Sequence, residues 1–525
     1  MLRLPSFIRP VGRQLRTFTT SSSGNWAKSS GSSDQEPPSS PNNDENPMSR
    51  TFNILKSDLN KFTDKFRSNK SSTPTSSVAE EVSDAEKLKR FEGDHHGAGG
   101  AEDIFQTHCD VLVIGGGGVG SSVAYWLKQR ARDGLNVVVV EKDSTYERAS
   151  TVLSVGGLRQ QFSLPENIQM SLYGADFMRD VKEHLGDDVE LNFTPHGYLV
   201  LASEEGAETL TRNSKLQNEL GARNELLNAN QLKAKFPWIN TEGIVLGCHG
   251  LEKEGWFDPW ALLMGYKKRA KQYGAHFVNG EVVGFELKEQ PDIIVRGNTE
   301  GDYQALDKVV IKMPDGETRT IKFAICVLAA GAFSGHIARM ANIGMGKGLL
   351  AFPLPVEPRK RYVYVINTQG QNAPGLGTPL TVDPCGTYFR RDGLGGNYLC
   401  GRSPTYEQEP PIDNLDVDHE YFETDIWPSL ANRCKAFESA KVVNCWAGYY
   451  EYNVFDENGI IGAHPYYNNM LIATGFSGHG IQQTPAVGRA ISELIIDGQF
   501  RSIDLSRLGF DRIVVDRPMF ETNIV

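Results

Sequence analysis

The sequence has no uncharged apolar run approaching the roughly 20 residues that a helix needs to span a bilayer, so we expect no transmembrane span. It also lacks an excess of basic residues. The net charge of -11 and the pI near 5.6 argue against nucleic acid as a partner, because phosphate binding needs a basic surface. None of the seven cysteines forms a CxxC pair, which indicates reduced thiols and no metal site.

Acidic residues are absent from the first 33 positions, where arginine, serine and threonine are frequent. This composition is typical of a mitochondrial transit peptide, which we place at residues 1–27; the alternative is a disordered basic tail. Residues 28–107 read as a low-complexity extension, with apolar residues at helical spacing over 51–66. That amphipathic helix would dock on the protein itself, on a partner or on a membrane surface, so peripheral association with the inner membrane stays open.

The globular part begins with a dinucleotide-binding pattern. An apolar strand at 111–114 enters the glycine turn GGGGVG (115–120), a helical pattern follows, and a second apolar strand at 137–140 ends on Glu141. The glycines allow a tight turn and close approach of the backbone to a pyrophosphate, and the helix N-terminus supplies N–H groups. Glu141 would bind an adenosine ribose and repel a 2′-phosphate, which favours NAD or FAD over NADP.

A second strand-glycine-helix pattern follows near the C-terminus, where NMLIATG (469–475) runs into GFSGHGI. The chain would therefore leave the dinucleotide domain, build a cap and return. We predict an α/β fold with a discontinuous Rossmann-like FAD-binding domain and a mixed, largely antiparallel cap of α+β type. The predicted boundaries are 108–190, 243–345 and 441–500 for the FAD-binding domain, 191–242 and 346–440 for the cap, and 501–525 for a C-terminal tail.

Five stretches carry a family resemblance: GGGGVG, SVGGLRQ, FDPWALLMGYKKRAKQYGAHFVNGEVVGFE, VLAAGAFS and GFSGHGIQQTPAVGRAISELI. In this order they resemble the flavoproteins related to D-amino-acid oxidase and sarcosine oxidase, over about residues 108–500. The resemblance implies FAD in the glycine turn. More narrowly, the arrangement is similar to a mitochondrial member associated with assembly of respiratory complex I, which implies complex I subunits or assembly intermediates as partners.

The resemblance also implies site residues. Those matched to the cofactor are Gly115, Gly117, Gly120, Glu141, Ser150, Ser154, Gly156, Gly157, Val283, Ala330, Gly331, Gly478, Gly480 and Ile481. The candidates for chemistry are Arg159, His479, Arg361, Tyr388 and Arg390. Arg159 would orient a substrate carboxylate, the two other arginines and Tyr388 are weaker candidates from the cap, and each cap residue would equally suit a structural role. His479 suits loop packing as well as chemistry.

Departures from the family pattern bear on how FAD is held and on the type of reaction. The loop STVLSVGG has no histidine for covalent attachment of FAD, and Cys445 lies about three positions early for attachment through cysteine. Gln482 stands where sarcosine oxidases hold the substrate carboxylate with a lysine, so the charge-assisted bond is lost. No lysine occurs between Lys360 and Lys435, the cap region in which fast oxidases keep one over the flavin. We therefore expect non-covalent FAD, and a dehydrogenase rather than an oxidase.

Two functions remain open on the sequence. The first is a mitochondrial protein of the matrix, or of the matrix face of the inner membrane, that acts in complex I assembly. The second is an active FAD-dependent dehydrogenase that oxidises an amine or a 2-hydroxy acid and passes the electrons to a mitochondrial acceptor.

Overall fold

The computed structural model describes residues 105–295, 301–368 and 372–522. The predicted transit peptide at 1–27 and the predicted helix at 51–66 lie outside the described residues. In the part of the chain that is described, no helix is long and apolar enough to cross a membrane.

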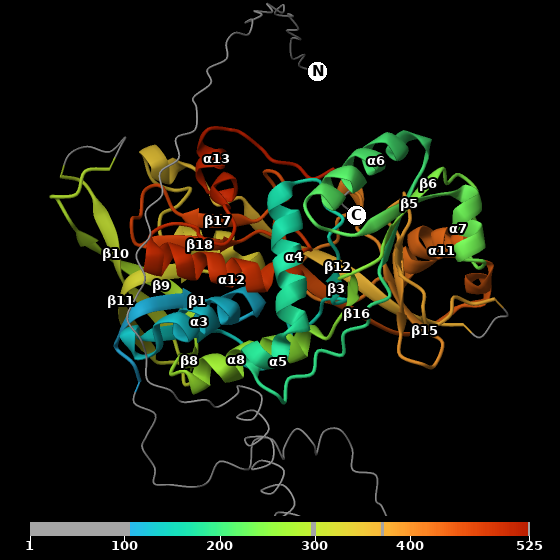
Figure 1. The fold of residues 1–525 in the computed structure, drawn as a ribbon. Coiled ribbons are helices and arrows are strands. Elements are labelled where there is room, and N and C mark those ends of the chain that lie inside the picture. Colours follow the sequence, from blue (N-terminus) through green and yellow to red (C-terminus); the bar gives the residue numbers. More distant parts are fainter. Residues whose placement is uncertain (1–104, 296–300, 369–371, 523–525) are drawn as a thin grey trace, which may run out of the picture. The chain divides into compact units, whose positions relative to one another are not determined.

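The first sheet has a parallel centre, with strand order β17-β18-β11-β1-β2-β8 (Figure 1). Its strands are β1 (His108–Ile114), β2 (Val137–Glu141), β8 (His276–Asn279), β9 (Glu281–Glu289), β10 (Gln304–Lys312), β11 (Thr318–Leu328), β17 (Ile460–Ala463) and β18 (Met470–Thr474). Residues 111–114 of β1 and the four valines of β2 are buried among neighbours on both faces, which suits continuous apolar runs. β18 pairs with β11 although more than 140 residues separate them, so one sheet is assembled from distant parts of the chain.

The second sheet is antiparallel except where β13 meets β4, and its order is β16-β12-β15-β14-β13-β4-β6-β5. Its strands are β4 (Tyr198–Ala202), β5 (Asn224–Asn228), β6 (Leu246–Gly250), β12 (Val356–Asn367), β13 (Leu380–Val382), β14 (Tyr388–Asp392), β15 (Asn397–Gly401) and β16 (Lys441–Asn453). A parallel-centred sheet beside a largely antiparallel one confirms the predicted fold class.

Two strands lie on the other side of the predicted domain boundaries. The boundary at 243 assigned β6 to the FAD-binding domain, yet β6 pairs with β4 and β5 in the second sheet. The boundary at 441 did the same for β16, which pairs with β12 along almost its whole length. Alternation of apolar residues predicts that a strand exists, whereas its sheet is decided by partners far away in the sequence.

Helices pack against both sheets. The longer ones are α3 (Gly118–Ala131), α4 (Pro165–Arg179), α6 (Glu204–Glu219), α8 (Pro259–Gln272) and α12 (Gly480–Asp497). The shorter ones are α5 (Val181–Leu185), α7 (Ala229–Lys235), α9 (Ser334–Met340), α10 (His419–Tyr421), α11 (Trp427–Arg433) and α13 (Asp511–Val514). α3 and α12 lie side by side (Figure 1), joined by bonds from Ser122 Oγ to the Thr484 carbonyl (2.7 Å) and from Trp126 Nε1 to the Pro485 carbonyl (2.9 Å). This contact brings the two glycine-containing turns together.

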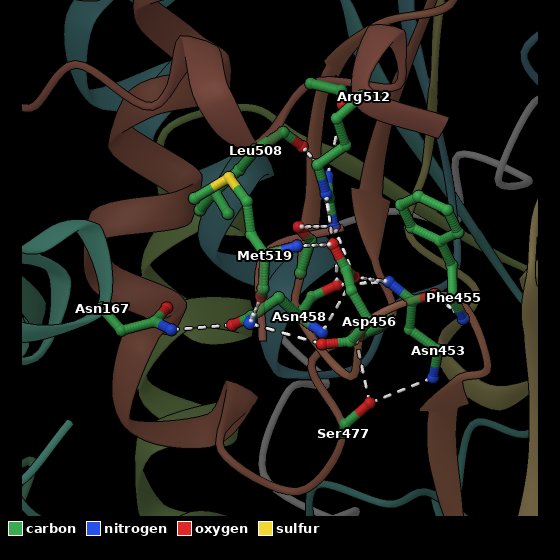
Figure 2. A network of polar contacts seen from close by, with 12 residues as sticks. Asn167, Asn453, Phe455, Asp456, Asn458, Ser477, Leu508, Arg512 and Met519 are labelled. Carbon is green, nitrogen blue, oxygen red and sulfur yellow. Dashed lines mark hydrogen bonds and ion pairs between the residues drawn. The ribbon is translucent and has the colours of Figure 1, made fainter. Parts of the chain in front are cut away.

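The segment predicted as a C-terminal tail packs against the body of the protein as far as it is described. Arg512 is buried and bonds both oxygens of Asp456, at 2.7 and 3.0 Å, and it also donates to backbone carbonyls (Figure 2). Asn458 continues this network to Asn167 of α4, and the Asn453 amide donates to Ser477 Oγ at 3.0 Å. The C-terminal segment is thus connected to the loop that begins α12.

Candidate functional site

The glycine turn between β1 and α3 is shaped by very close packing. Gly115 has φ +98°, and a Cβ built on it would lie 2.3 Å from the Ala329 carbonyl oxygen. A Cβ on Gly120 would lie 1.8 Å from the Gly115 carbonyl oxygen, so the helix approaches the strand too closely for any side chain. Ala330 and Gly331 follow β11 at this same point, with the Ala330 Cα beside Gly115. Gly115, Gly120 and Ala330 therefore shape the turn by packing.

Gly117 differs from its neighbours because no protein atom requires a glycine there. Its φ is -65°, and the nearest atom to a Cβ built on it is Thr151 Oγ1, at an ordinary contact distance of 3.4 Å. Gly117 is also the N-cap of α3 and has no side chain to cap it; the first turn has no acidic residue, and of its amides that of Gly118 donates to Thr151 Oγ1 at 3.0 Å. A helix N-terminus left in this state attracts anions, so the open space at Gly117 suits a pyrophosphate.

Glu141 closes the other side of the turn. Its Oε2 accepts a hydrogen bond from the Gly116 amide at 2.7 Å, and its Oε1 accepts one from the Asp143 amide at 2.9 Å. Burial raises the pKa of the carboxyl, and these two amides partly offset the rise. The predicted ribose-binding acid is therefore anchored beside the turn.

A cleft adjoins the turn, with an empty volume of about 1430 Å³ that includes solvent at its mouth. It starts at Val119 and Thr151 beside the N-terminus of α3 and reaches Leu380 and Val382 of the second sheet. Ten predicted site residues line it: Ser150, Ser154, Gly157, Arg159, Arg361, Tyr388, Gly478, His479, Gly480 and Ile481. The structure thus brings together residues that lie more than 300 positions apart in the sequence.

The late loop enters the cleft at the N-terminus of α12. Gly478 has φ +92°, and a Cβ on it would lie 2.4 Å from the Tyr450 ring. His479 is only 4% exposed, and neither of its ring nitrogens has a partner in good hydrogen-bond geometry. Burial, and secondarily the charge of Arg159, lowers the pKa of His479 to about 3. The imidazole is therefore neutral at physiological pH, which suits a hydrogen-bonding partner for a ligand and not a general base.

Arg159 supplies a positive charge to the cleft. Its amide donates to Gln482 Oε1 at 2.7 Å, which fixes the backbone, and its guanidinium lies 4.8 Å from the centre of the Phe162 ring. Within the described residues the guanidinium makes no hydrogen bond and no ion pair, although the residue is 9% exposed. An unpaired guanidinium in a nearly buried position favours binding of a carboxylate.

The two other candidate arginines have partners within the protein. Arg361 lines the cleft, but its guanidinium is held in a bidentate pair with Glu409, at 3.0 and 2.7 Å. Arg390 does not line the cleft; it donates from Nε to the Val155 carbonyl at 2.9 Å and approaches Asp392. Arg390 therefore supports the 150–157 loop. These contacts favour the structural role that the sequence left open for Arg390, because sequence alone cannot show which arginines are already paired.

Two further predicted cofactor residues, Gly156 and Val283, are not among the residues that line the cleft. Gly156 has φ +73° and a Cβ there would lie 2.1 Å from the Phe257 carbonyl oxygen, so close backbone packing explains this glycine. Val283 lies on β9 at a register shift, where Val282 pairs with Ile311 and Gly284 pairs with Val310. It is 41% exposed, and the bulge leaves its backbone without a partner residue across the ladder.

Sequence reasoning missed several residues of the cleft, among them Thr151, Tyr198, Arg402, Tyr450 and Glu451. Thr151 had a detectable signal, because it directly follows Ser150 in the recognised loop; its Oγ1 accepts from the Gly118 amide at 3.0 Å. Glu451 had none. It belongs to a strand of the second sheet, and only the pairing of β16 with β12 carries it to the end of β18.

An open glycine turn on a parallel sheet, leading into a cleft walled by a second sheet, defines a dinucleotide-dependent oxidoreductase fold. Comparison with known proteins agrees. Residues 110–494 match the family described as FAD dependent oxidoreductase (DAO), and the chain belongs to this family.

Known proteins resemble this chain both in sequence and in structure. The chain is 56% identical to the FAD-dependent oxidoreductase domain-containing protein 1 homolog of Drosophila melanogaster, over 98% of both chains. It is 46% identical to FAD-dependent oxidoreductase domain-containing protein 1 of Mus musculus, over 79% of this chain and 87% of that one. L-proline dehydrogenase from P. horikoshii has a similar structure, with a TM-score of 0.65 and 25% identity, over 79% of this chain and 100% of that one.

The residues present fit the FAD that the family implies. The space at Gly117 and the uncapped start of α3 suit the pyrophosphate, and Glu141 suits the ribose. The uncapped start of α12, with the unpartnered His479, suits the polar edge of a flavin ring.

Proposed function

We propose that this protein holds FAD non-covalently and oxidises a small carboxylate-bearing amine or 2-hydroxy acid in the cleft. The observation that carries the proposal is the unpaired Arg159 guanidinium in a cleft that continues from the FAD turn. Among the described residues lining that cleft there is no cysteine, and His479 is the one histidine. Cys445 packs instead against the buried cluster of the second sheet, which supports non-covalent attachment.

FAD, when bound, supplies the acceptor for a hydride from the substrate carbon. The chain's own residues have to position that substrate. Arg159 would hold the carboxylate, and Leu380 and Val382 would exclude water from the far wall. Tyr198 is buried and Tyr388 is partly buried, and burial raises the pKa of each phenol. Both phenols therefore stay protonated and are available as hydrogen-bond donors.

Electrons would leave to an acceptor other than oxygen. No lysine is found among the described residues that line the cleft. Lys360, which directly precedes the cleft residue Arg361 in the sequence, is buried and donates to Asn414 Oδ1 at 3.2 Å. Anaerobically reduced protein should recover its visible absorbance quickly with an artificial electron acceptor and slowly with dissolved oxygen. Fast recovery with oxygen would contradict the assignment as a dehydrogenase.

Replacing Arg159 by methionine should raise the substrate concentration needed for half-maximal reduction by about 10-fold to 100-fold. A charge-assisted hydrogen bond contributes about 1.5–3 kcal/mol, and the substitution removes it while keeping much of the apolar side-chain volume. The measurement is anaerobic reduction of the holoprotein by a panel of amino and 2-hydroxy acids. As a control, the amide of the best substrate should be affected much less, because it has no carboxylate. Equal losses for acid and amide would exclude carboxylate binding by Arg159.

We also propose a role in mitochondria, in the assembly of respiratory complex I, with complex I subunits or assembly intermediates as partners. The support is the family resemblance and the arginine-rich, acid-poor segment at 1–27. Depletion of the protein should lower the amount of assembled complex I, and re-expression of the full chain should restore it. Re-expression of a Gly117→Ala variant would show whether bound FAD is needed. Unchanged complex I after depletion would refute this role.

A further inference from the structure

The cleft is lined by one carboxyl group, that of Glu451, to which the proposed oxidation assigns no role. Glu451 lies on β16 and faces the turn that follows β18, where its Oε2 accepts from both Thr474 Oγ1 and the Gly475 amide, each at 3.1 Å. These two donors engage Oε2, and the Phe476 amide also donates to the carboxyl. The other oxygen, Oε1, is directed at the start of α12: a Cβ built on Gly480 would lie 3.2 Å from it.

The carboxyl therefore joins two turns at the inner end of the cleft, the loop between β18 and α12 and the turn after β11. Oε2 also lies near Gly331, where a Cβ would be 3.9 Å away, so the turn after β11 meets the turn after β18 at this side chain. Glycines at 331 and 480 leave the carboxyl open to the cleft that it lines. The proposed FAD site lies against these same turns.

The unpaired guanidinium of Arg159 lines the same cleft, but neither it nor any other charged group is among the causes that set the pKa of Glu451. The titratable groups that face it or flank it from the neighbouring elements are Arg159, Glu357, Arg359, Arg361, Tyr450, Tyr452, Glu457 and His479. Arg359 pairs with Glu357 at 2.5 Å, Arg361 pairs with Glu409, and His479 is neutral. Burial raises the pKa of Glu451 to about 7, against the opposing hydrogen bonds from the turn after β18.

We propose that Glu451 binds FAD in its neutral, protonated form, so that binding of the cofactor takes up one proton from solvent at this carboxyl. FAD carries a negatively charged pyrophosphate and would remove the remaining water from the cleft, and both effects disfavour a carboxylate. A neutral carboxyl keeps Oε2 as acceptor for Thr474 and Gly475, while Oε1–H donates to an acceptor atom of the flavin. This inference rests on the proposed FAD site and adds to it a dependence on pH.

The sign of the effect follows from the direction of the shift. Below the pKa of the free carboxyl the neutral form is already present and the affinity for FAD is constant. Above it, each unit of pH costs up to tenfold in affinity, because a proton has to be bound first. Between about pH 6 and about pH 8.5 we expect the Kd for FAD to rise about tenfold or more.

A Glu451→Gln variant provides the test. Glutamine has the shape of the neutral acid, accepts through its carbonyl oxygen and donates from its amide at every pH. Its Kd for FAD, measured by flavin fluorescence on the protein after release and return of the cofactor, should change less than about twofold over the same range. Persistence of the wild-type pH dependence in this variant would overturn the proposal.

Glu254→Gln is the matched control. Glu254 is 3% exposed and thus more buried than the part-exposed Glu451, and burial raises its pKa to about 7 as well. It accepts from the Gln160 amide and from Gln161 Nε2, but it does not line the cleft. This variant should keep the full pH dependence of FAD binding. If Glu254→Gln abolishes it and Glu451→Gln does not, the linked proton lies elsewhere and the proposal is wrong.

A second measurement needs no variant. Titration calorimetry of FAD into the wild-type apoprotein near pH 8, in two buffers of different ionisation enthalpy, should show uptake of close to one proton per FAD. FAD binding without proton uptake would overturn the role of Glu451 and leave the flavin site intact. Absence of FAD binding at every pH would instead refute the proposed function itself.

Discussion

Replacing Gly117 by alanine should weaken FAD binding by about 100-fold, which is about 2.7 kcal/mol, while the apoprotein keeps its free energy of unfolding. The new methyl group meets only Thr151 Oγ1, at 3.4 Å, so the fold has room for it. It would occupy the space in which a pyrophosphate approaches the start of α3, and displacing that anion loses charge-assisted bonds to backbone N–H groups. Flavin fluorescence gives the affinity, and urea unfolding of the apoprotein gives the stability.

Gly120→Ala is the matched control, three residues along the same turn. Its Cβ would lie 1.8 Å from the Gly115 carbonyl oxygen, so helix and strand have to separate. We expect the free energy of unfolding of this variant's apoprotein to fall by about 1–3 kcal/mol or more, as is typical of overpacking. Urea unfolding measures this loss. Equal destabilisation by both substitutions would show that Gly117 is also a packing glycine and remove the argument for the pyrophosphate.

Replacing Arg512 by methionine should lower the free energy of unfolding by about 3–5 kcal/mol. Its side chain is 5% exposed and that of Asp456 is fully buried, so the substitution leaves an uncompensated carboxylate in the interior (Figure 2). It also removes the donors to the carbonyls of Asn458 and Gly459, each at 3.1 Å. Urea unfolding followed by tryptophan fluorescence measures the loss.

Two further variants test the cause of that loss. The double variant Arg512→Met with Asp456→Leu should recover part of the stability, because it removes the stranded charge together with its partner. Lys142→Met removes one half of an exposed pair with Glu281, whose side chains are 69% and 43% exposed, and should cost at most about 1 kcal/mol. A loss below about 1 kcal/mol for Arg512→Met would mean that the buried network does not anchor the C-terminal segment.

Sequence reasoning was most successful where the determinants are local. The order of β1, glycine turn, α3 and β2 depends on residues within about 30 positions, and its apolar runs, glycines and terminal Glu141 all indicate the same unit. The late turn at Gly478 and Gly480 was recognised for the same reason. The α/β class then follows, because two such units need a parallel sheet to join them.

Long-range contacts decided the rest. The sequence by itself determined the dinucleotide turns and the fold class of this protein, since strand period and glycine geometry are properties of neighbouring residues. Only the tertiary structure decided that β6 and β16 belong to the second sheet, that Arg159 is free while Arg361 and Arg390 are paired, and that Glu451 reaches the cleft. Pairing of strands and of charges joins residues hundreds of positions apart, and no local pattern records it.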